Sequence, residues 1–141
     1  MDLRLELVLV PVSDVDRAKA FYAEQVGFRI DVDTSPTDGM RVVQLTPPGS
    51  ACSITIGDGL GLGEPGSVRG THLVVTDIVA SRDELARRGV EVSEVRHFSR
   101  EEGSWRPGPH PEHDDYASFA DFADPDGNTW VLQEVGWVGD A

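Results

Sequence analysis

The densest group of metal-binding side-chain types lies in a polar stretch of the second half of the chain. Two histidines and three acidic residues occur there close together: His110, Glu112, His113, Asp114 and Asp115. Imidazole and carboxylate groups bind Zn²⁺ and Ni²⁺, but a functional site needs a helix or strand that holds its ligands in register. The stretch shows no such periodicity. We therefore favour a solvated loop over a metal site here.

The other reactive side chains lack the partners that nucleophilic catalysis requires. Cys52, the single cysteine, has no base beside it in the sequence and is predicted to be a small buried apolar residue. The glycine-rich segment Gly57–Gly63 lacks the Lys-Ser/Thr pair of a P-loop and does not open a helix. His72 is better placed, because it lies on a predicted strand and could act as a hydrogen-bonding residue or a general base. A structural histidine with satisfied hydrogen bonds is the favoured interpretation.

The segments that would position these side chains begin with one strand, one helix and three strands. Leu5–Val12 is a short apolar run that favours a strand. Ser13 and Asp14 supply N-cap oxygens for the helix that follows, and Gly27 stands where helices commonly end. Alternating or apolar runs predict three further strands, at residues 28–32, 40–46 and 51–56.

A glycine-rich segment, Gly57–Gly70, separates this module from a second one with the same order. Thr71–Val75 predicts a strand, Thr76–Ile78 matches Ser13–Val15 as a helix start, and Gly89 ends the helix. This correspondence at nearly constant spacing indicates an internal repeat. Further strands are predicted at residues 90–95, 116–123 and 129–135, with a long polar loop at 97–115 and a tight turn at 124–128.

The bulk composition restricts the class of protein. The chain has 141 residues, 39% of them hydrophobic, and a formal charge of −13. This length is typical of one domain that buries its own core. The negative charge repels phosphate groups, so we expect neither nucleic acid nor anionic membranes as partners. The N-terminus lacks the order of a signal peptide, and no apolar run approaches the roughly 20 residues that span a bilayer. Together with the single cysteine, these features predict a soluble, cytoplasmic protein.

Two stretches of the sequence resemble one known family. The first is Val10–Tyr22, which reads Val-Pro-Val-Ser-Asp-Val-Asp-Arg-Ala-Lys-Ala-Phe-Tyr, followed by Gly27-Phe28. It resembles the first module of vicinal-oxygen-chelate (glyoxalase/bleomycin-resistance/dioxygenase) proteins. The second is Phe122–Asn128, Phe-Ala-Asp-Pro-Asp-Gly-Asn, which resembles the hairpin before their last strand.

The resemblance implies an α+β fold of two βαβββ modules whose mixed sheets curl into an open cup, with the helices outside. We accordingly predict one glyoxalase-like domain over residues 1–141, with module one at 1–57, a linker at 58–69 and module two at 70–137. The family also implies a homodimer. Its members include lyases, dioxygenases, transferases and metal-free antibiotic-binding proteins, so the fold alone does not choose a function.

The metal-dependent members of the family imply four ligand positions, two in each module. These positions fall on Leu7, Ser53, Gly70 and Val131 in this sequence. Leucine and valine cannot bind a divalent cation, glycine offers no side chain, and a serine alone makes a poor site. We therefore predict no metal and no other cofactor; a divalent cation held by other residues is the alternative.

A predicted cup lining follows from strand alternation, which sends residues two apart to one face of a sheet. His72 and Gln133 share the faces of Gly70 and Val131, whereas Glu134 and Trp130 should face away. Trp105, in the long polar loop, is suited to stack on a flat or cationic ligand, to close the cup or to pack at a dimer interface. The predicted ligand-binding residues are Leu7, Leu9, Ser53, Thr55, His72, Val74, Trp105, Val131 and Gln133. A mainly apolar lining with a few polar groups is typical of a small-molecule pocket; the other interpretation is a cup filled by its own side chains.

Three functions fit this pattern. The preferred hypothesis is a metal-free protein that sequesters an apolar or aromatic compound in the cup, as a homodimer. The alternative is a glyoxalase-type lyase or isomerase that acts on a small carbonyl compound, with a relocated metal or with His72 as a catalytic base. The third is a structural or interaction module.

Overall fold

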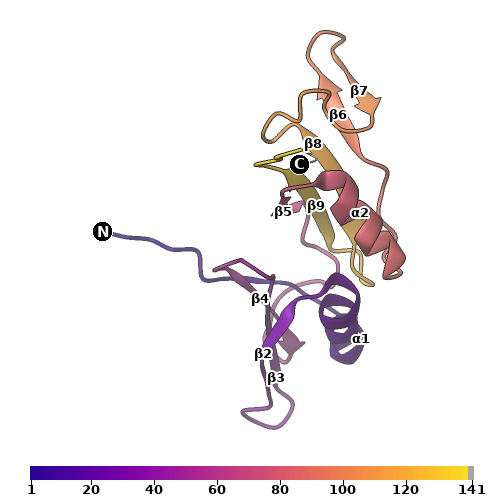
Figure 1. Cartoon of the computed structure of the whole chain (residues 1–141). Helices are drawn as coiled ribbons and strands as arrows, with labels where there is room; N and C mark the ends of the chain where they lie inside the picture. Colours follow the sequence, from indigo (N-terminus) through magenta and orange to yellow (C-terminus); the bar gives the residue numbers. More distant parts are fainter. Residues whose placement is uncertain (140–141) are drawn as a thin grey trace. The chain divides into compact units, whose positions relative to one another are not determined.

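A computed structural model of the chain describes residues 1–139. Its elements follow the order β1-α1-η1-β2-β3-β4 and then β5-α2-β6-β7-β8-β9 (Figure 1). The described chain divides into two compact units. Unit 1 comprises Met1–Val68 together with Asp124–Asn128, and unit 2 comprises the remaining described residues. The predicted α+β fold with two strand–helix–strand modules is confirmed, and the second module carries one additional strand, β7.

Unit 1 contains a four-stranded sheet in the order β1-β4-β3-β2, with β1 parallel to β4 and the other pairs antiparallel. Helix α1 packs against β4, so that the apolar side chains between them form the core. The elements are β1 (Leu7–Leu9), α1 (Val15–Ala20), its π-helical continuation η1 (Phe21–Val26), β2 (Arg29–Thr34), β3 (Arg41–Thr46) and β4 (Ser53–Asp58). The buried core includes Val10, Ala18, Tyr22, Val43, Leu45, Ile54 and Ile56.

Unit 2 contains a five-stranded sheet in the order β5-β9-β8-β6-β7, in which only β5 and β9 pair in parallel. Helix α2 packs against β8 and β9. The elements are β5 (Thr71–Val75), α2 (Ile78–Arg87), β6 (Arg96–Ser99), β7 (Ser104–Pro107), β8 (Ser118–Ala123) and β9 (Thr129–Glu134). Trp130 and Glu134 are buried, in agreement with the expectation that they face away from the open side of the sheet. The buried core includes Ile78, Ala120, Phe122, Trp130 and Leu132.

The two helices begin with the same cap. Asp14 accepts a hydrogen bond from the Arg17 N–H at 3.0 Å, and Asp77 accepts one from the Ala80 N–H at 3.0 Å. The φ angles of the two aspartates are −137° and −139°. The repeat inferred from the sequence is therefore reproduced in backbone geometry. No helix in the described part of the chain is long and apolar enough to cross a membrane.

The strand predicted at residues 90–95 is wrong. Val90, Val92 and Val95 are buried, but this segment forms only an isolated bridge, and the next strand, β6, begins at Arg96. The Arg82 guanidinium donates to the carbonyl oxygens of Val92 and Ser93 at 3.2 and 3.1 Å. A side chain thus satisfies backbone groups that a strand ladder would otherwise satisfy.

The long polar loop predicted at 97–115 is also wrong in its first half, because β6 and β7 form an antiparallel hairpin there. In unit 1, the expected alternation of residues 28–32 is interrupted by a β-bulge between Ile30 and Val32. Ile30 lies opposite Leu45 and Val32 opposite Gln44, so the two apolar side chains point to different faces. Both are exposed, whereas Phe28 is buried.

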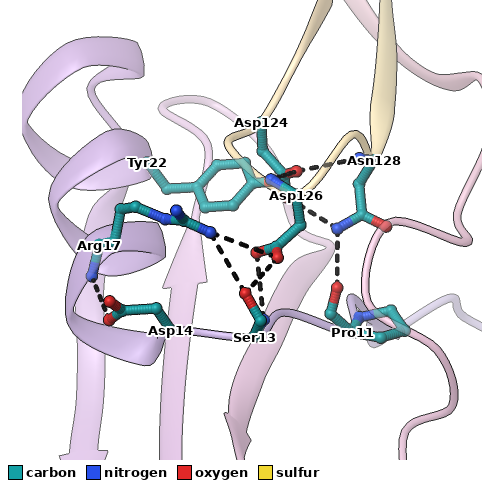
Figure 2. A network of polar contacts seen from close by, with 8 residues as sticks. All are labelled: Pro11, Ser13, Asp14, Arg17, Tyr22, Asp124, Asp126 and Asn128. Atoms are coloured by element: carbon teal, nitrogen blue, oxygen red, sulfur yellow. Dashed lines mark hydrogen bonds and ion pairs between the residues drawn. The ribbon is translucent and has the colours of Figure 1, made fainter.

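The turn between β8 and β9 belongs to unit 1, as does the amino-terminal segment that it contacts. The buried Tyr22 hydroxyl donates to Asp124 Oδ2 at 2.7 Å, and Asn128 Nδ2 donates to the Pro11 carbonyl oxygen at 2.8 Å (Figure 2). Gly127 has a φ of 95°, which glycine adopts without strain. The predicted tight turn is confirmed, and it supplies buried hydrogen bonds to residues more than a hundred positions earlier in the chain.

Candidate functional site

The predicted ligand-binding residues of unit 1 share one face of its sheet. Leu7 lies opposite Ser53 and Leu9 opposite Thr55 in the parallel pair β1–β4. Leu9 is 48% exposed, but Ser53 and Thr55 are only 5% and 6% exposed. The polar half of this predicted lining is therefore buried rather than open to a ligand.

A chain of hydrogen bonds explains the burial of Ser53. Its Oγ lies 2.7 Å from Thr46 Oγ1 and 3.4 Å from Gln44 Nε2. The Thr46 hydroxyl also donates to Asp31, which accepts a second hydrogen bond from Arg29 Nε at 2.8 Å. These bonds, first that of Thr46 and then that of Arg29, hold the pKa of Asp31 below its usual value. The polar side chains on this face of unit 1 satisfy one another.

The predicted residues of unit 2 lie on a more open face. His72 pairs with Val131 and Val74 pairs with Gln133 across the β5–β9 ladder. His72 is exposed, and Val74 is 59% exposed. His72 Nδ1 lies 2.6 Å from the carbonyl oxygen of Gly70. Because a carbonyl oxygen only accepts, Nδ1 carries the ring proton and Nε2 presents its lone pair.

Trp105 lies on β7 rather than in a loop, and it belongs to an aromatic cluster. Its ring makes edge-to-face contacts with Phe98 and Phe119, with 5.6 Å between centroids in each pair. The Arg96 guanidinium lies 5.1 Å from the centroid of the same ring and forms an ion pair with Asp121 at 2.9 Å. Trp105 remains 52% exposed despite these contacts.

Sequence reasoning identified Trp105 and missed its neighbours. The register explains why they meet: Phe98 pairs with Trp105 across β6–β7, and Arg96 pairs with Phe119 across β6–β8. These cross-strand pairs follow from hydrogen-bond register that no local pattern reveals. The available signal for a strand was the alternation of polar and aromatic residues at 96–99. The charged residues that follow it favoured a loop instead.

A groove of about 850 Å³ opens beside this cluster, entirely within unit 2. One wall is the β6–β7 hairpin, and the other is the segment that leads into β8. The lining contains aromatic rings, two imidazoles and several carboxylates, among them Phe98, Trp105, Tyr116, Phe119, His97, His110, Glu101, Glu112, Asp114 and Asp115. This size and mixture suit a small organic molecule.

The family's metal-ligand positions do not fit a divalent cation. The Ser53 hydroxyl is already hydrogen-bonded within the sheet, and Leu7 beside it offers no donor atom. In unit 2, the Val131 side chain offers no donor atom for a metal. Gly70 has no side chain, and its N–H donates to Thr129 Oγ1 at 2.7 Å. Within residues 1–139, no three His, Cys, Asp or Glu side chains stand close enough together to hold a metal ion.

The interpretation of residues 110–115 as a solvated loop is wrong for His113. Its Nδ1 lies 2.7 Å from Oε1 of the fully buried Glu134, and its ring stacks on Trp137 with 3.7 Å between centroids. The other Glu134 oxygen accepts the Ile78 N–H at 2.9 Å, at the start of α2. The buried Glu134 carboxylate therefore links the segment around His113, which forms one wall of the groove, to the end of β9.

Comparisons with known proteins agree with this architecture. A model of the Glyoxalase/Bleomycin resistance protein/Dioxygenase superfamily matches residues 4–132. An antibiotic-binding protein from Streptomyces sp. CB03234 is 34% identical with a TM-score of 0.72, covering 94% of this chain and 96% of its own. A glyoxalase/bleomycin resistance protein from the same organism is 34% identical with a TM-score of 0.69, covering 93% and 100%. A superfamily member from Sphaerobacter thermophilus DSM 20745 is 26% identical with a TM-score of 0.71, covering 95% and 98%. No curated protein matches significantly.

Proposed function

Because the chain belongs to the glyoxalase/bleomycin resistance/dioxygenase superfamily, we propose that it is a metal-free protein that sequesters an apolar or aromatic small molecule. The observation that carries the proposal is the exposed aromatic cluster of unit 2, in which Trp105 and Phe98 are 52% and 42% exposed beside the groove. Contiguous apolar patches that stay exposed on a protein surface mark interaction or ligand-binding sites. A flat ligand stacked on Trp105 would cover it.

The similarity to an antibiotic-binding protein supports this class of function. The predicted residues His72, Val74, Val131 and Gln133 extend the aromatic cluster into a larger open face of the same sheet. Apolar burial would supply most of the affinity, and the few polar groups would orient the ligand. The metal-free part of the proposal rests on the donor chemistry at the family's ligand positions.

The proposal includes a homodimer. Strand β1 lies at the edge of the unit 1 sheet, and the residues that lead into it continue its alternation with largely exposed leucines. Leu3, Leu5 and Leu9 are 87%, 71% and 48% exposed. An exposed edge of this composition tends to pair with another chain. Sedimentation equilibrium would measure the mass directly, and a monomer at micromolar concentration would remove this part of the proposal.

A second candidate, a lyase or isomerase acting on a small carbonyl compound, is favoured by the tautomer of His72. Its exposed Nε2 lone pair is suited to accept a proton from a carbon next to a carbonyl group. Exchange of such protons with deuterated water, followed by NMR for small hydroxyketones, would test it. We expect no exchange above the uncatalysed rate; exchange that disappears in His72→Phe would favour the enzyme.

The test of the binding proposal uses protein purified without an affinity tag. Elemental analysis after dialysis comes first, because a stoichiometric metal would contradict the metal-free proposal. A panel of aromatic antibiotics and polycyclic aromatic compounds is then screened for an increase in melting temperature. Trp105→Ala should weaken binding at least tenfold, since it removes the exposed ring. Trp137→Phe, outside the groove lining, is the matched control. A panel that leaves the melting temperature unchanged would contradict the proposal.

A further inference from the structure

Two imidazole rings line the groove of unit 2 side by side. The rings of His97 and His110 meet edge to face with 5.8 Å between centroids. His97 is only 9% exposed, on the second residue of β6. Burial of a ring with two polar nitrogens requires that each nitrogen be satisfied by the protein or by what occupies the groove.

The surroundings of His97 fix which of its nitrogens carries the proton. Nδ1 lies 2.8 Å from the carbonyl oxygen of Gly108. This oxygen can only accept, so Nδ1 is the donor and Nε2 of the neutral ring holds a lone pair. Nε2 has no hydrogen-bond partner within residues 1–139, yet no side-chain nitrogen there is both fully buried and unpaired. Nε2 is therefore accessible, and the groove that the ring lines is the space that reaches it.

His110 has the opposite arrangement. Its Nδ1 accepts the backbone N–H groups of Glu112 and Asp114 at 3.2 and 3.4 Å. An acceptor nitrogen carries no proton, so the ring proton of His110 is on Nε2. The nearest carboxylate oxygen, Oδ2 of Asp114, lies 3.8 Å from Nε2, which is longer than a hydrogen bond. The two neighbouring rings thus offer the groove one acceptor, from His97, and one donor, from His110.

We infer that this pair recognises the hydroxyl group of a phenol-type aromatic ligand, an inference that rests on the proposed function. A hydroxyl donates through its hydrogen and accepts through its oxygen, so it can satisfy His97 Nε2 and His110 Nε2–H together. A carbonyl or ether oxygen only accepts and leaves His97 unpaired. An ammonium group only donates and leaves His110 unpaired.

The charge of the groove selects the neutral form of such a ligand. Four carboxylates line it, those of Glu101, Glu112, Asp114 and Asp115, against one guanidinium, that of Arg100. This balance disfavours carboxylate and phenolate ligands. Without a ligand, water can hydrogen-bond to both imidazoles. A ligand that displaces this water without offering a hydroxyl group therefore loses the hydrogen bonds to His97 and His110.

A matched series of three ligands tests the inference: naphthalene, 2-methoxynaphthalene and 2-naphthol. Their dissociation constants are measured by equilibrium dialysis at mildly alkaline pH, where imidazole in water is neutral. The wild-type protein should bind 2-naphthol about tenfold more tightly than 2-methoxynaphthalene, because only the hydroxyl satisfies both rings. Equal binding of the three compounds would overturn the inference and leave the proposed function intact. Failure of all three to bind would contradict the proposed function itself.

Two variants of one residue separate recognition from folding. In His97→Asn, the amide nitrogen can still donate to Gly108, but no acceptor reaches the position of Nε2, so the preference for 2-naphthol over 2-methoxynaphthalene should fall below twofold. In His97→Gln, the longer side chain returns a polar group to that position and should restore part of the preference. His110→Phe should reduce the preference in the same way as His97→Asn. A tenfold preference that persists in both His97→Asn and His110→Phe would overturn the inference.

Discussion

The two units use one strand–helix–strand plan and treat the open face of the sheet in opposite ways. In unit 1, Ser53 and Thr55 are buried, and Ser53 belongs to a chain of hydrogen bonds that ends at Asp31. In unit 2, Val74 and Trp105 stand exposed on the corresponding face. The comparison teaches that a repeated module can keep its caps and its register while only one copy presents an exposed aromatic surface.

The difference has a local cause. Unit 2 carries the additional strand β7, which pairs only with β6 and brings Trp105 beside Phe98. The corresponding edge of unit 1 is the exposed, bulged strand β2, whose Asp31 bonds to the sheet instead of facing a ligand. The groove of unit 2 therefore depends on an addition to the repeat rather than on the repeat itself.

The largest expected decrease in the free energy of unfolding comes from removing a buried carboxylate of unit 1. Asp124 accepts four hydrogen bonds, from the Tyr22 hydroxyl, the Asp126 N–H and both the N–H and the amide of Asn128. Asp124→Ala removes these four hydrogen bonds from a buried turn and should lower the free energy of unfolding by about 3 kcal/mol. Guanidinium denaturation followed by circular dichroism measures the change.

The control for this variant lies in the same turn. Asp126 bonds to the exposed Ser13 and to the half-exposed Arg17, whose groups can turn to water. Asp126→Ala should cost about 1 kcal/mol. Equal decreases in the free energy of unfolding would show that the buried hydrogen bonds of Asp124 stabilise the fold no more than those of Asp126.

A second substitution asks whether the polar chain of unit 1 stabilises its fold. Thr46 connects Ser53 to Asp31, so Thr46→Val should lower the free energy of unfolding by about 1–2 kcal/mol. Thr55 is equally buried but makes no side-chain hydrogen bond within the described residues, so Thr55→Val should change it by less than about 0.5 kcal/mol. Reversed magnitudes would contradict the assignment of a structural role to this face.

The open face of unit 2 should contribute little to stability in the absence of ligand. Trp105→Ala removes two edge-to-face contacts and one cation–π contact, all at an exposed site. We expect a loss of about 1 kcal/mol or less in the same denaturation experiment. A loss above about 3 kcal/mol would make the cluster structural and would remove the contrast between the two units.

The smallest effect concerns acid stability. Hydrogen bonds from Arg41 and then Lys19 hold the pKa of Asp33 below its usual value, as Thr46 and Arg29 do for Asp31. A depressed pKa in the folded state stabilises the fold above the unfolded pKa of about 3.9 and loses this contribution as the pH falls below it. Lys19→Gln raises this depressed folded-state pKa, so it should flatten the decrease in stability in the acid range below about pH 3.

The control for the acid experiment is an exposed ion pair of unit 2. Arg87→Gln removes a partner of Glu84 at the surface of α2 and should leave the slope of stability against pH unchanged. Urea denaturation at a series of pH values measures both slopes. An identical slope for wild type and Lys19→Gln would contradict the role of Asp33.

The parts of the fold that the sequence predicts are those specified within a few residues. Asp14 and Asp77 cap their helices through bonds to the third residue onward, and the turn at Asp124–Asn128 contains its own proline and glycine. The β6–β7 hairpin was missed because the register between its strands, not a local pattern, brings Phe98 to Trp105. The tautomers of the groove histidines likewise depend on backbone groups from other segments.

The discontinuity of unit 1 has a consequence for how the protein is made. Residues 1–68 leave the ribosome before the turn at Asp124–Asn128, which satisfies the Tyr22 hydroxyl and the Pro11 carbonyl and is synthesised only after strands β5 to β8. The amino-terminal half therefore cannot reach its final state by folding during translation and must wait for the carboxy-terminal hairpin. A nascent chain arrested before residue 124 would expose an incomplete core to proteases and chaperones, because the turn at Asp124–Asn128 is part of unit 1.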